Sequence, residues 1–421
     1  MTEKSNIERR LFLKTAGAAG LASILSAKTF GADPNATCKT EDPNSDPNSK
    51  ADTKKALHPQ VPKRPLGKTG VKVPILNLGG MFDIPDNQIM LKKALQWGVN
   101  YWDTAHSYGN GQSELGIGTF LKKNPDARKN IFLVTKASRA KSIADIDSRL
   151  KTSFERMNTD YIDLYYGVHG LSDPAKLTSE LRQWAEKAKK KGQIKYFGFS
   201  THKNMSACLT AAAKAGWIDA VMTTYNYRQM QDPAMNAAIE DCRKAGVGII
   251  AMKTQGQRQK DPTTEADTKI RSHFLERGFT LQQANIKAVW QDKRIATICS
   301  QMPNMAILIS NIAAAMDKTK LTKEDMAMYA RFANDTCDQY CIACGRCAFA
   351  VQGMPYVSEV MRYMMYYNGY GQKLRAKQCF ANLPESVRKG LTRFDYRNAE
   401  AICPQKMPIA ELMRNAATLL A

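Results

Sequence analysis

Short apolar runs that alternate with amphipathic segments are the feature that most restricts the fold of this chain. Eight such runs predict strands at residues 75–78, 99–102, 131–135, 161–168, 196–200, 220–225, 248–252 and 297–300. Helical periodicity between them predicts helices at residues 87–97, 143–157, 174–191, 205–215 and 233–245. Strands that alternate with helices in this way predict an α/β fold, a (β/α)8 TIM barrel, for which about 250 residues is typical.

Two further features bear on the barrel. Residues 66–73 alternate around a Gly turn and predict a hairpin before the first barrel strand. A doubly wound open sheet is the alternative fold. No G-x-G-x-x-G sequence follows the first predicted strand, which counts against a dinucleotide-binding sheet of that kind.

Four polar residues follow successive predicted strands. Asp103 ends the second strand, Tyr108 lies in the loop after it, Lys136 ends the third strand and His169 ends the fourth. Active sites of barrels lie at the C-terminal ends of the strands, so we expect these side chains to meet. An ammonium lowers the pKa of a neighbouring phenol, and a carboxylate holds the ammonium in place. Tyr108 would then donate a proton to a carbonyl oxygen, with His169 orienting or assisting it.

Taken singly, each of these residues is common as a turn, surface or structural side chain. Together with their flanking sequence they make the chain resemble the aldo/keto reductase family between residue 64 and about residue 320. The matching segments are residues 65–73 (PLGKTGVKV), residues 103–109 (DTAHSYG), Lys136, His169 and residues 198–202 (GFSTH).

This resemblance implies an oxidoreductase that uses NADPH or NADH and acts on a small carbonyl or alcohol substrate. It implies that Asp103, Tyr108, Lys136 and His169 form the catalytic tetrad. It also implies cofactor contacts from Ser200, which matches a residue that contacts the nicotinamide amide, and from Thr201, Tyr225 and Lys253.

The cofactor half of the site departs from the family pattern. Met222 stands where the family often has a Gln, and Met252 stands where an aromatic residue often stacks on the nicotinamide. Residues 300–305 (SQMPNM) replace the loop that grips the adenosine phosphate. The sequence therefore matches the family better in its acid–base residues than in its nucleotide-binding residues.

A group of cysteines near the C-terminus predicts a metal centre. Cys341, Cys344 and Cys347 have the C-x2-C-x2-C spacing of ferredoxins, and Cys403-Pro404 follows later. In two-cluster ferredoxins the fourth Cys of each run ligates the other cluster, so these four residues are the full ligand set of one cluster. The ligands of the second cluster are replaced by Arg393, Tyr396, Ala399 and Val351.

This pattern predicts one [4Fe-4S] cluster in a small helical, ferredoxin-like C-terminal domain, with a helix over residues 361–370. Structural zinc and disulfides are the alternatives that four thiols allow. Cys208, Cys242 and Cys299 fall in barrel elements and are expected to be buried as small apolar side chains. Cys337 precedes the run, Cys38 lies before the barrel, and Cys379 has no predicted role.

The N-terminus has the pattern of an export signal. Arg9 and Arg10 begin the sequence RRLFLK, and an apolar stretch of small residues follows at 16–27. This arrangement resembles a twin-arginine signal, a receptor-read address. An amphipathic surface helix is the alternative. Residues 33–62 are rich in Asp, Pro, Asn, Ser and Lys and predict a disordered linker.

The predicted organisation is therefore a signal at 1–32, a linker at 33–62, a barrel at 63–320 and a helical iron–sulfur domain at 321–421. The predicted location is the periplasm or cell envelope, with no transmembrane segment once the signal is removed. The net charge of +22 comes from scattered lysines. No Arg-rich arm or aromatic–basic alternation indicates a nucleic-acid partner.

Two functions fit these features. The first is an oxidoreductase whose cluster conducts electrons or stabilises the fold; export would require it to recycle its cofactor through an external redox partner protein. The second is an exported electron-transfer or binding protein that has lost the use of nicotinamide. The intact tetrad favours the first.

Overall fold

A computed structural model of the chain describes residues 58–255 and 264–421. The predicted signal, Cys38 and the linker up to residue 57 lie outside these ranges. Within the described ranges, no helix combines the length and the apolar character needed to cross a membrane.

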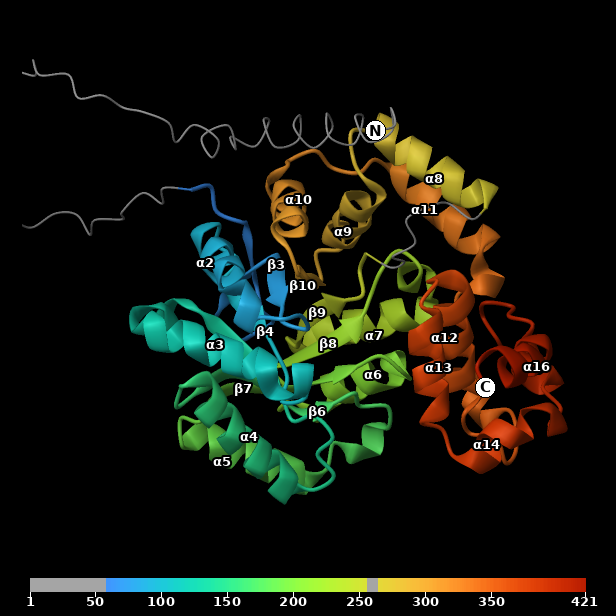
Figure 1. The fold of residues 1–421 in the computed structure, drawn as a ribbon, viewed down its shortest axis with the longest axis horizontal. Helices are drawn as coiled ribbons and strands as arrows, with labels where there is room; N and C mark the ends of the chain where they lie inside the picture. Colours follow the sequence, from blue (N-terminus) through green and yellow to red (C-terminus); the bar gives the residue numbers. More distant parts are fainter. Residues whose placement is uncertain (1–57, 256–263) are drawn as a thin grey trace, which may run out of the picture.

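The predicted barrel is confirmed. Eight parallel strands close on themselves in the order β10-β3-β4-β5-β6-β7-β8-β9 (Figure 1). A separate antiparallel pair, β1 with β2, forms a hairpin, but its first strand precedes the predicted range of 66–73, most of which connects the two strands. Each barrel strand overlaps its predicted range. The strands are β1 Lys63–Pro65, β2 Lys72–Pro74, β3 Leu76–Gly79, β4 Tyr101–Asp103, β5 Phe132–Lys136, β6 Ile162–His169, β7 Ile194–Thr201, β8 Ala220–Thr224, β9 Gly248–Met252 and β10 Ile295–Gln301.

Helices surround the barrel, including several that the sequence patterns did not predict. Those found at predicted positions are α2 Gln88–Gln96, α4 Ile143–Met157, α5 Ser179–Lys190, α6 Met205–Ala215 and α7 Pro233–Ala245. The others are α3 Gln112–Lys123, α8 Glu265–Glu276, α9 Leu281–Gln291 and α10 Met305–Met316.

One predicted helix is wrong in its bounds. The prediction placed a single helix at 174–191, but a 3-10 turn at Pro174–Lys176 precedes α5. The break has a local cause, because the Thr178 side chain accepts a hydrogen bond from the Leu181 amide (3.2 Å) and so caps α5.

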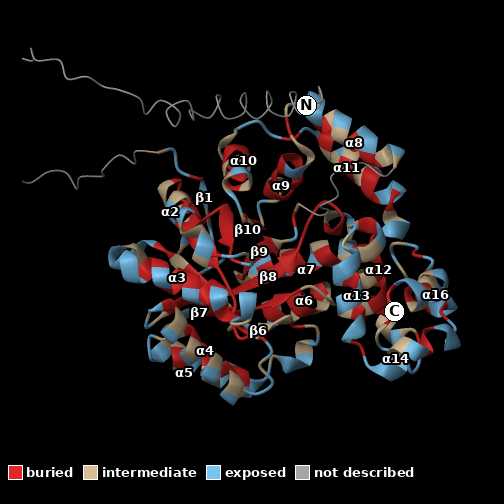
Figure 2. Cartoon of the chain, in the orientation of Figure 1, coloured by how far each residue is buried: buried red, intermediate tan, exposed pale blue. Residues whose placement is uncertain are grey.

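Buried residues of the barrel strands and the surrounding helices form two apolar clusters, and Figure 2 shows these residues in red on the strands and on the helices around them. Neighbouring strands approach each other closely within the barrel. A Cβ atom on Gly198 of β7 would lie 1.9 Å from the carbonyl oxygen of Ala220 on β8, so only glycine fits there. The middle of β7 and the first residue of β8 are thus held close together.

A second group of helices follows the barrel: α11 Lys323–Asp335, α12 Val357–Met364, α13 Lys373–Ala381, α14 Glu385–Gly390, α15 Arg397–Ala401 and α16 Ile409–Leu419. A π-helix at Met365–Gly369 extends α12, so the predicted helix at 361–370 is confirmed in part. A core of its own, built from residues between 340 and 420, holds α12 to α16 together. Helix α11 instead packs its buried Tyr329 and Phe332 against Phe274 of α8, beside the barrel.

The C-terminal helices rest on the barrel near the ends of β7 and β8 (Figure 1). Lys203 forms an ion pair with Glu359 of α12, and the Asn204 amide donates to the Ala343 carbonyl (3.1 Å). Arg346 lies 3.7 Å from Asp232 at the start of α7. These contacts place the C-terminal unit over the end of the barrel that carries the predicted site.

Candidate active site

A buried ion pair lies at the C-terminal ends of β4 and β5. The Lys136 Nζ atom is 2.5 Å from Asp103 Oδ1 and donates to the Thr104 carbonyl at 2.6 Å. Both side chains are at most 2% exposed. Burial opposes the charge on Lys136, but Asp103 and Tyr108 outweigh it, so the pKa of Lys136 is raised and the ammonium is retained at neutral pH.

The phenol of Tyr108 lies beside this ammonium. Lys136 Nζ is 4.9 Å from the centroid of the Tyr108 ring. The effect of Lys136 on the pKa of Tyr108 is downward, as the sequence predicts, but burial raises it by more, so the net shift is upward. The expected lowering of this pKa is therefore wrong for the protein alone, because the sequence did not reveal how far the phenol is buried.

His169 completes the predicted tetrad. Its ring lies edge-on to Tyr108, with centroids 6.0 Å apart, and its Nδ1 atom is 2.8 Å from Ser138 Oγ. Burial, aided by Lys136, lowers the pKa of His169 to about 3. The imidazole is therefore neutral at neutral pH and acts as a hydrogen-bonding group. The structure brings all four predicted tetrad residues together.

Sequence reasoning missed the residues that support the Tyr108 loop. Glu114 of α3 is fully buried and accepts hydrogen bonds from Thr135 (2.7 Å) and Ser153 (2.6 Å). Arg156 of α4 bonds Glu114 (3.1 Å) and donates to the His106 carbonyl (2.9 Å), two residues before Tyr108. Glu114 is 21 to 42 residues from these partners in sequence, so no short motif reveals the contacts.

Cys299 of β10 also lies at the site, although it was expected to be only a small buried side chain. Burial and the nearby Asp103 carboxylate both raise the pKa of its thiol. Cys208 and Cys242 are buried in the core, as predicted. Cys299 differs because its strand ends next to the tetrad.

The predicted cofactor residues divide into two groups. Ser200 and Thr201 are buried at the end of β7, where Ser200 Oγ accepts from the Gly170 amide (3.1 Å) beside His169. Lys253 follows β9 and lines a cavity at the same end of the barrel, together with Thr224. The Thr224 hydroxyl is buried and has no hydrogen-bond partner among the described residues, so this cavity suits a polar ligand.

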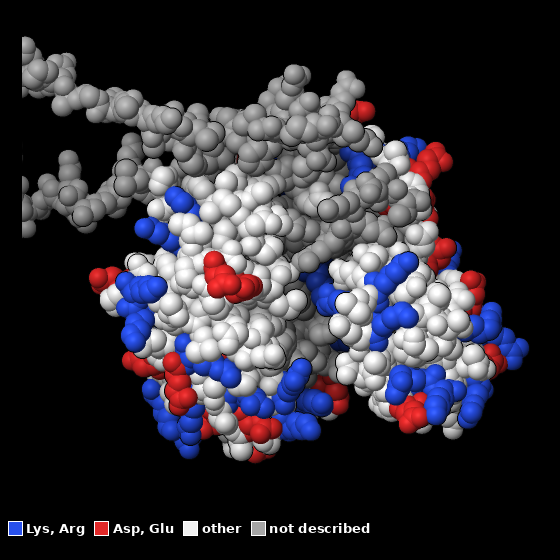
Figure 3. All heavy atoms as spheres, viewed as in Figure 1, with Lys and Arg blue, Asp and Glu red and all other residues white. Residues whose placement is uncertain are grey.

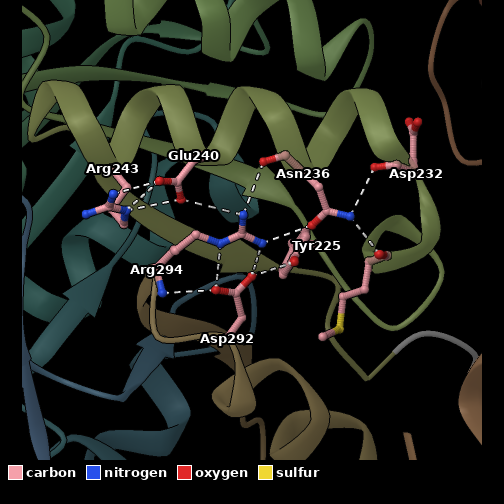
Figure 4. A network of polar contacts seen from close by, with 8 residues as sticks. Tyr225, Asp232, Asn236, Glu240, Arg243, Asp292 and Arg294 are labelled. Carbon is pink, nitrogen blue, oxygen red and sulfur yellow. Dashed lines mark hydrogen bonds and ion pairs between the residues drawn. The ribbon is translucent and has the colours of Figure 1, made fainter. Parts of the chain in front are cut away.

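Tyr225 is not part of this group. Its ring is fully buried in the core, and its hydroxyl donates to Asp292 Oδ2 at 2.7 Å. Figure 4 shows Tyr225 pointing into a polar network in which Arg294 bridges Asp292, Asn236 and Glu240. The sequence could not show this, because a Tyr at a strand end has the same pattern whichever way it points.

The four predicted metal ligands lie around one cavity in the C-terminal unit. Cys341, Cys344, Cys347 and Cys403 all line it, with Met361 and Ile409 among its apolar walls. The described cysteines, these four included, are free thiols. Within residues 58–255 and 264–421, no group of three or more His, Cys, Asp or Glu side chains is arranged as a metal-ion site. The cluster therefore stays a prediction.

The family model and the similar proteins found by comparison point to the same family. The model described as "Aldo/keto reductase family" matches residues 76–333. The chain is 26% identical over 231 residues to an aldo-keto reductase of Alternaria alternata, covering 44% of this chain and 63% of the relative. It is 21% identical over 290 residues to L-galactose dehydrogenase of Arabidopsis thaliana, covering 62% of this chain and 90% of that protein.

A solved structure shares the fold. The holo form of an aldo-keto reductase from Bacillus halodurans aligns with a TM-score of 0.53 and 23% identity, over 65% of this chain and 96% of that chain. The chain spans just under two thirds of the length of the Alternaria relative. The family model's match, residues 76–333, contains the tetrad and ends before the four clustered cysteines.

Two half-buried histidines, His169 and His202, predict how stability depends on pH. Burial and nearby cations, led by Lys253, lower the pKa of His202 to about 2, and that of His169 is likewise low. The ordinary histidine pKa is about 6.5, so below this pH the unfolded chain binds protons that the folded chain does not. The free energy of unfolding should therefore fall as the pH is lowered from neutrality.

Replacement of His202 by Gln should reduce the slope of the free energy of unfolding against pH by roughly 1 kcal/mol per pH unit below about pH 6. Urea unfolding of the wild-type protein and of His202→Gln, at neutral and at mildly acidic pH, measures the difference. An equal pH slope in the two proteins would contradict the assignment.

Proposed function

The chain belongs to the aldo/keto reductase family, and from this premise we propose that it is an oxidoreductase that interconverts small carbonyl compounds and alcohols. The observation that carries the proposal is the buried Lys136–Asp103 ion pair next to Tyr108 and His169. Burial of a lysine and a carboxylate costs desolvation free energy, which their mutual attraction offsets only in good geometry. Here the buried pair lies beside the phenol of Tyr108, where its charge can act on a proton donor.

In the reductive direction, Tyr108 donates its proton to the carbonyl oxygen, which becomes the alcohol oxygen. Lys136 stabilises the phenolate that remains, because its ammonium lies 4.9 Å from the ring. Asp103 holds Lys136 in place. Neutral His169, fixed by Ser138, bonds the same carbonyl oxygen and orients it toward Tyr108.

The cofactor is proposed to be NADPH or NADH. A reduced nicotinamide, when bound, supplies the hydride that the carbonyl carbon needs. Ser200 and Thr201 would hold its amide end, and Lys253 would meet a phosphate. The unpartnered Thr224 hydroxyl beside Lys253 supports a polar ligand there, whereas the buried Tyr225 does not contribute.

The C-terminal unit is proposed to hold one [4Fe-4S] cluster. Cys341, Cys344, Cys347 and Cys403 would be its ligands, and their placement around a single apolar cavity supports this. The Ala343 amide donates to Cys341 Sγ (3.3 Å), a contact that favours a thiolate. Such a cluster would either conduct electrons or stabilise the helices around it.

Export through the twin-arginine pathway to the periplasm or cell envelope is proposed from Arg9 and Arg10 and the apolar stretch that follows. A protein exported in folded form needs its cofactor reoxidised or reduced again after each turnover. An external redox partner protein, reached through the cluster, would meet this need.

An exported electron-transfer or binding protein without nicotinamide chemistry is the alternative. It is not favoured, because the family match spans the tetrad and electron transfer alone does not require a buried Lys136–Asp103 pair.

Replacement of Tyr108 by Phe should lower kcat by at least about a hundredfold, because the proton donor is lost. The matched control is Tyr165→Phe, whose hydroxyl bonds the Ile146 carbonyl in the core. Turnover of carbonyl substrates with NADPH or NADH measures the effect. Wild-type turnover by Tyr108→Phe would rule out the proposed role.

Replacement of Cys344 by Ser should reduce bound iron and the visible absorbance of the anaerobically purified protein, from about four iron atoms per chain. Cys379→Ser, outside the cavity, is the control and should retain both. Iron analysis together with zinc analysis distinguishes a cluster from a structural zinc ion. Equal iron in both variants would contradict the ligand assignment.

Replacement of both Arg9 and Arg10 by Lys should stop export, so that the protein accumulates inside the cell. Lys14→Arg, in the same segment, should still be exported. Fractionation of cells that express each variant measures this, and export of the double variant would exclude the twin-arginine pathway.

A further inference from the structure

A second cavity lies where the barrel mouth meets the C-terminal helices. Its walls come from both units, the barrel and the C-terminal helices. His202, Thr224, Arg228 and Lys253 line it from the barrel, and Tyr340, Cys341, Arg362 and Tyr366 line it from the C-terminal unit. Figure 3 shows Lys and Arg side chains along the crevice between these two parts of the molecule.

The charge of this cavity is one-sided. Arg228, Lys253 and Arg362 line it, and no Asp or Glu does. Among the ion pairs formed by the described residues, none includes any of these three side chains. Arg375 adds a fourth cation, with its guanidinium 4.7 Å from the centroid of the Tyr366 ring. Arg228 is buried and already donates to the Ala333 carbonyl (3.3 Å) and to Thr336 Oγ1 (2.8 Å), so Lys253 and Arg362 are the cations that remain for a ligand. Like charges this close repel each other, and a bound anion would compensate them.

Unused polar atoms point to a ligand independently of charge. Thr224 is 8% exposed, and its hydroxyl has no hydrogen-bond partner among the described residues. The same holds for the buried Nε atom of Arg362. Buried polar atoms are nearly always bonded, so a hydroxyl and one guanidinium nitrogen without partners, on two residues that line one cavity, indicate a missing acceptor.

The cavity is built rather than loose. Arg362 Nη1 donates to the His202 carbonyl (3.4 Å) across the interface. Lys253 has a left-handed backbone (φ 57°), which the Asn226 side chain supports by donating to its carbonyl (3.2 Å). Arg228 stacks on Tyr340 at 3.8 Å. A lysine held in a left-handed conformation is strained, and such strain is concentrated at functional sites.

The inner end of this cavity adjoins the tetrad. His202 Cε1 would lie 3.6 Å from a Cβ atom on Gly170, the residue that follows His169. We infer that this interdomain cavity binds an oxyanion, a carboxylate or a phosphate, carried by a molecule whose reacting carbon lies at Tyr108. The oxyanion belongs either to the substrate or to the nucleotide. The inference rests on the proposed function only for the identity of that molecule.

The binding test uses the full chain and needs no turnover. Inorganic phosphate is titrated calorimetrically into the wild-type protein, Arg362→Met, Lys253→Met and the control Lys373→Met. The Lys373→Met substitution removes one positive charge from the C-terminal unit, but Lys373 does not line the cavity. We expect binding to weaken by about tenfold or more in the first two variants, since a charge-assisted hydrogen bond is lost, and to be unchanged in the control. Arg362→Lys should recover part of the loss.

Phosphate binding that is equal in wild type, Arg362→Met and Lys253→Met would overturn the inference, as would an equal loss in Lys373→Met. Circular dichroism and thermal unfolding of each variant establish that it is folded. If either lining variant does not fold, the wild-type protein is tested instead. Phosphate and sulfate are allowed to compete for it, and the measurement is the protection of Lys253 from acylation. Unprotected Lys253 would then overturn the inference.

Two kinetic arms distinguish the sources of the oxyanion. If it belongs to the substrate, Arg362→Met raises KM for succinic semialdehyde about tenfold or more but leaves KM for butanal unchanged. If it belongs to the nucleotide, the variant raises the Kd for NADP+ and affects both aldehydes equally. Absence of turnover in the wild type would count against the proposed function alone, because phosphate binding is measured without it.

Discussion

The ion pair between Lys136 and Asp103 is the interaction on which the site depends. Two charges removed from water are favourable together only in good geometry, and here the ammonium bonds both the Asp103 carboxylate and the Thr104 carbonyl. Loss of one partner would leave the other buried and uncompensated, at a cost of about 3–5 kcal/mol. The closed barrel supplies this geometry, because β4 and β5 are neighbours in which Asp103 pairs with Val134, two residues before Lys136.

The same pair explains the other features of the tetrad. Burial raises the pKa of Tyr108, and the charge on Lys136 offsets part of this rise. Burial lowers the pKa of His169, and the same charge lowers it further. A phenol that keeps its proton beside a fixed cation is ready to lose it when a carbonyl oxygen takes up charge. Glu114 of α3 and Arg156 of α4 bond each other, and Arg156 bonds the loop that carries the phenol. The two helices therefore hold this loop in place.

The sequence predicted most of the fold and the central part of the site, since both follow from local patterns. Strand period and strand ends are readable without tertiary information, and Asp103, Lys136 and His169 each end a strand. What it missed depends on contacts between distant elements. The net pKa shift of Tyr108 depends on its burial, Cys299 reaches the site only because β10 closes the barrel, and Tyr225 turns toward Asp292. Helix α11 follows the predicted boundary at residue 320, yet its aromatic face packs on α8.

The C-terminal unit bears on the site through its position. Cys341 lines both the cavity surrounded by the four cysteines and the cationic cavity at the barrel mouth. Ile342 lines both cavities as well, so the two cavities adjoin, and the Asn204–Ala343 and Lys203–Glu359 contacts hold this part of the C-terminal unit against the barrel. A negatively charged ligand next to a cluster would alter its electrostatic surroundings, and reduction of the cluster would in turn weaken the hold on the ligand. Because such coupling is reciprocal, the interface between the two units is the place where electron transfer and ligand binding would influence each other.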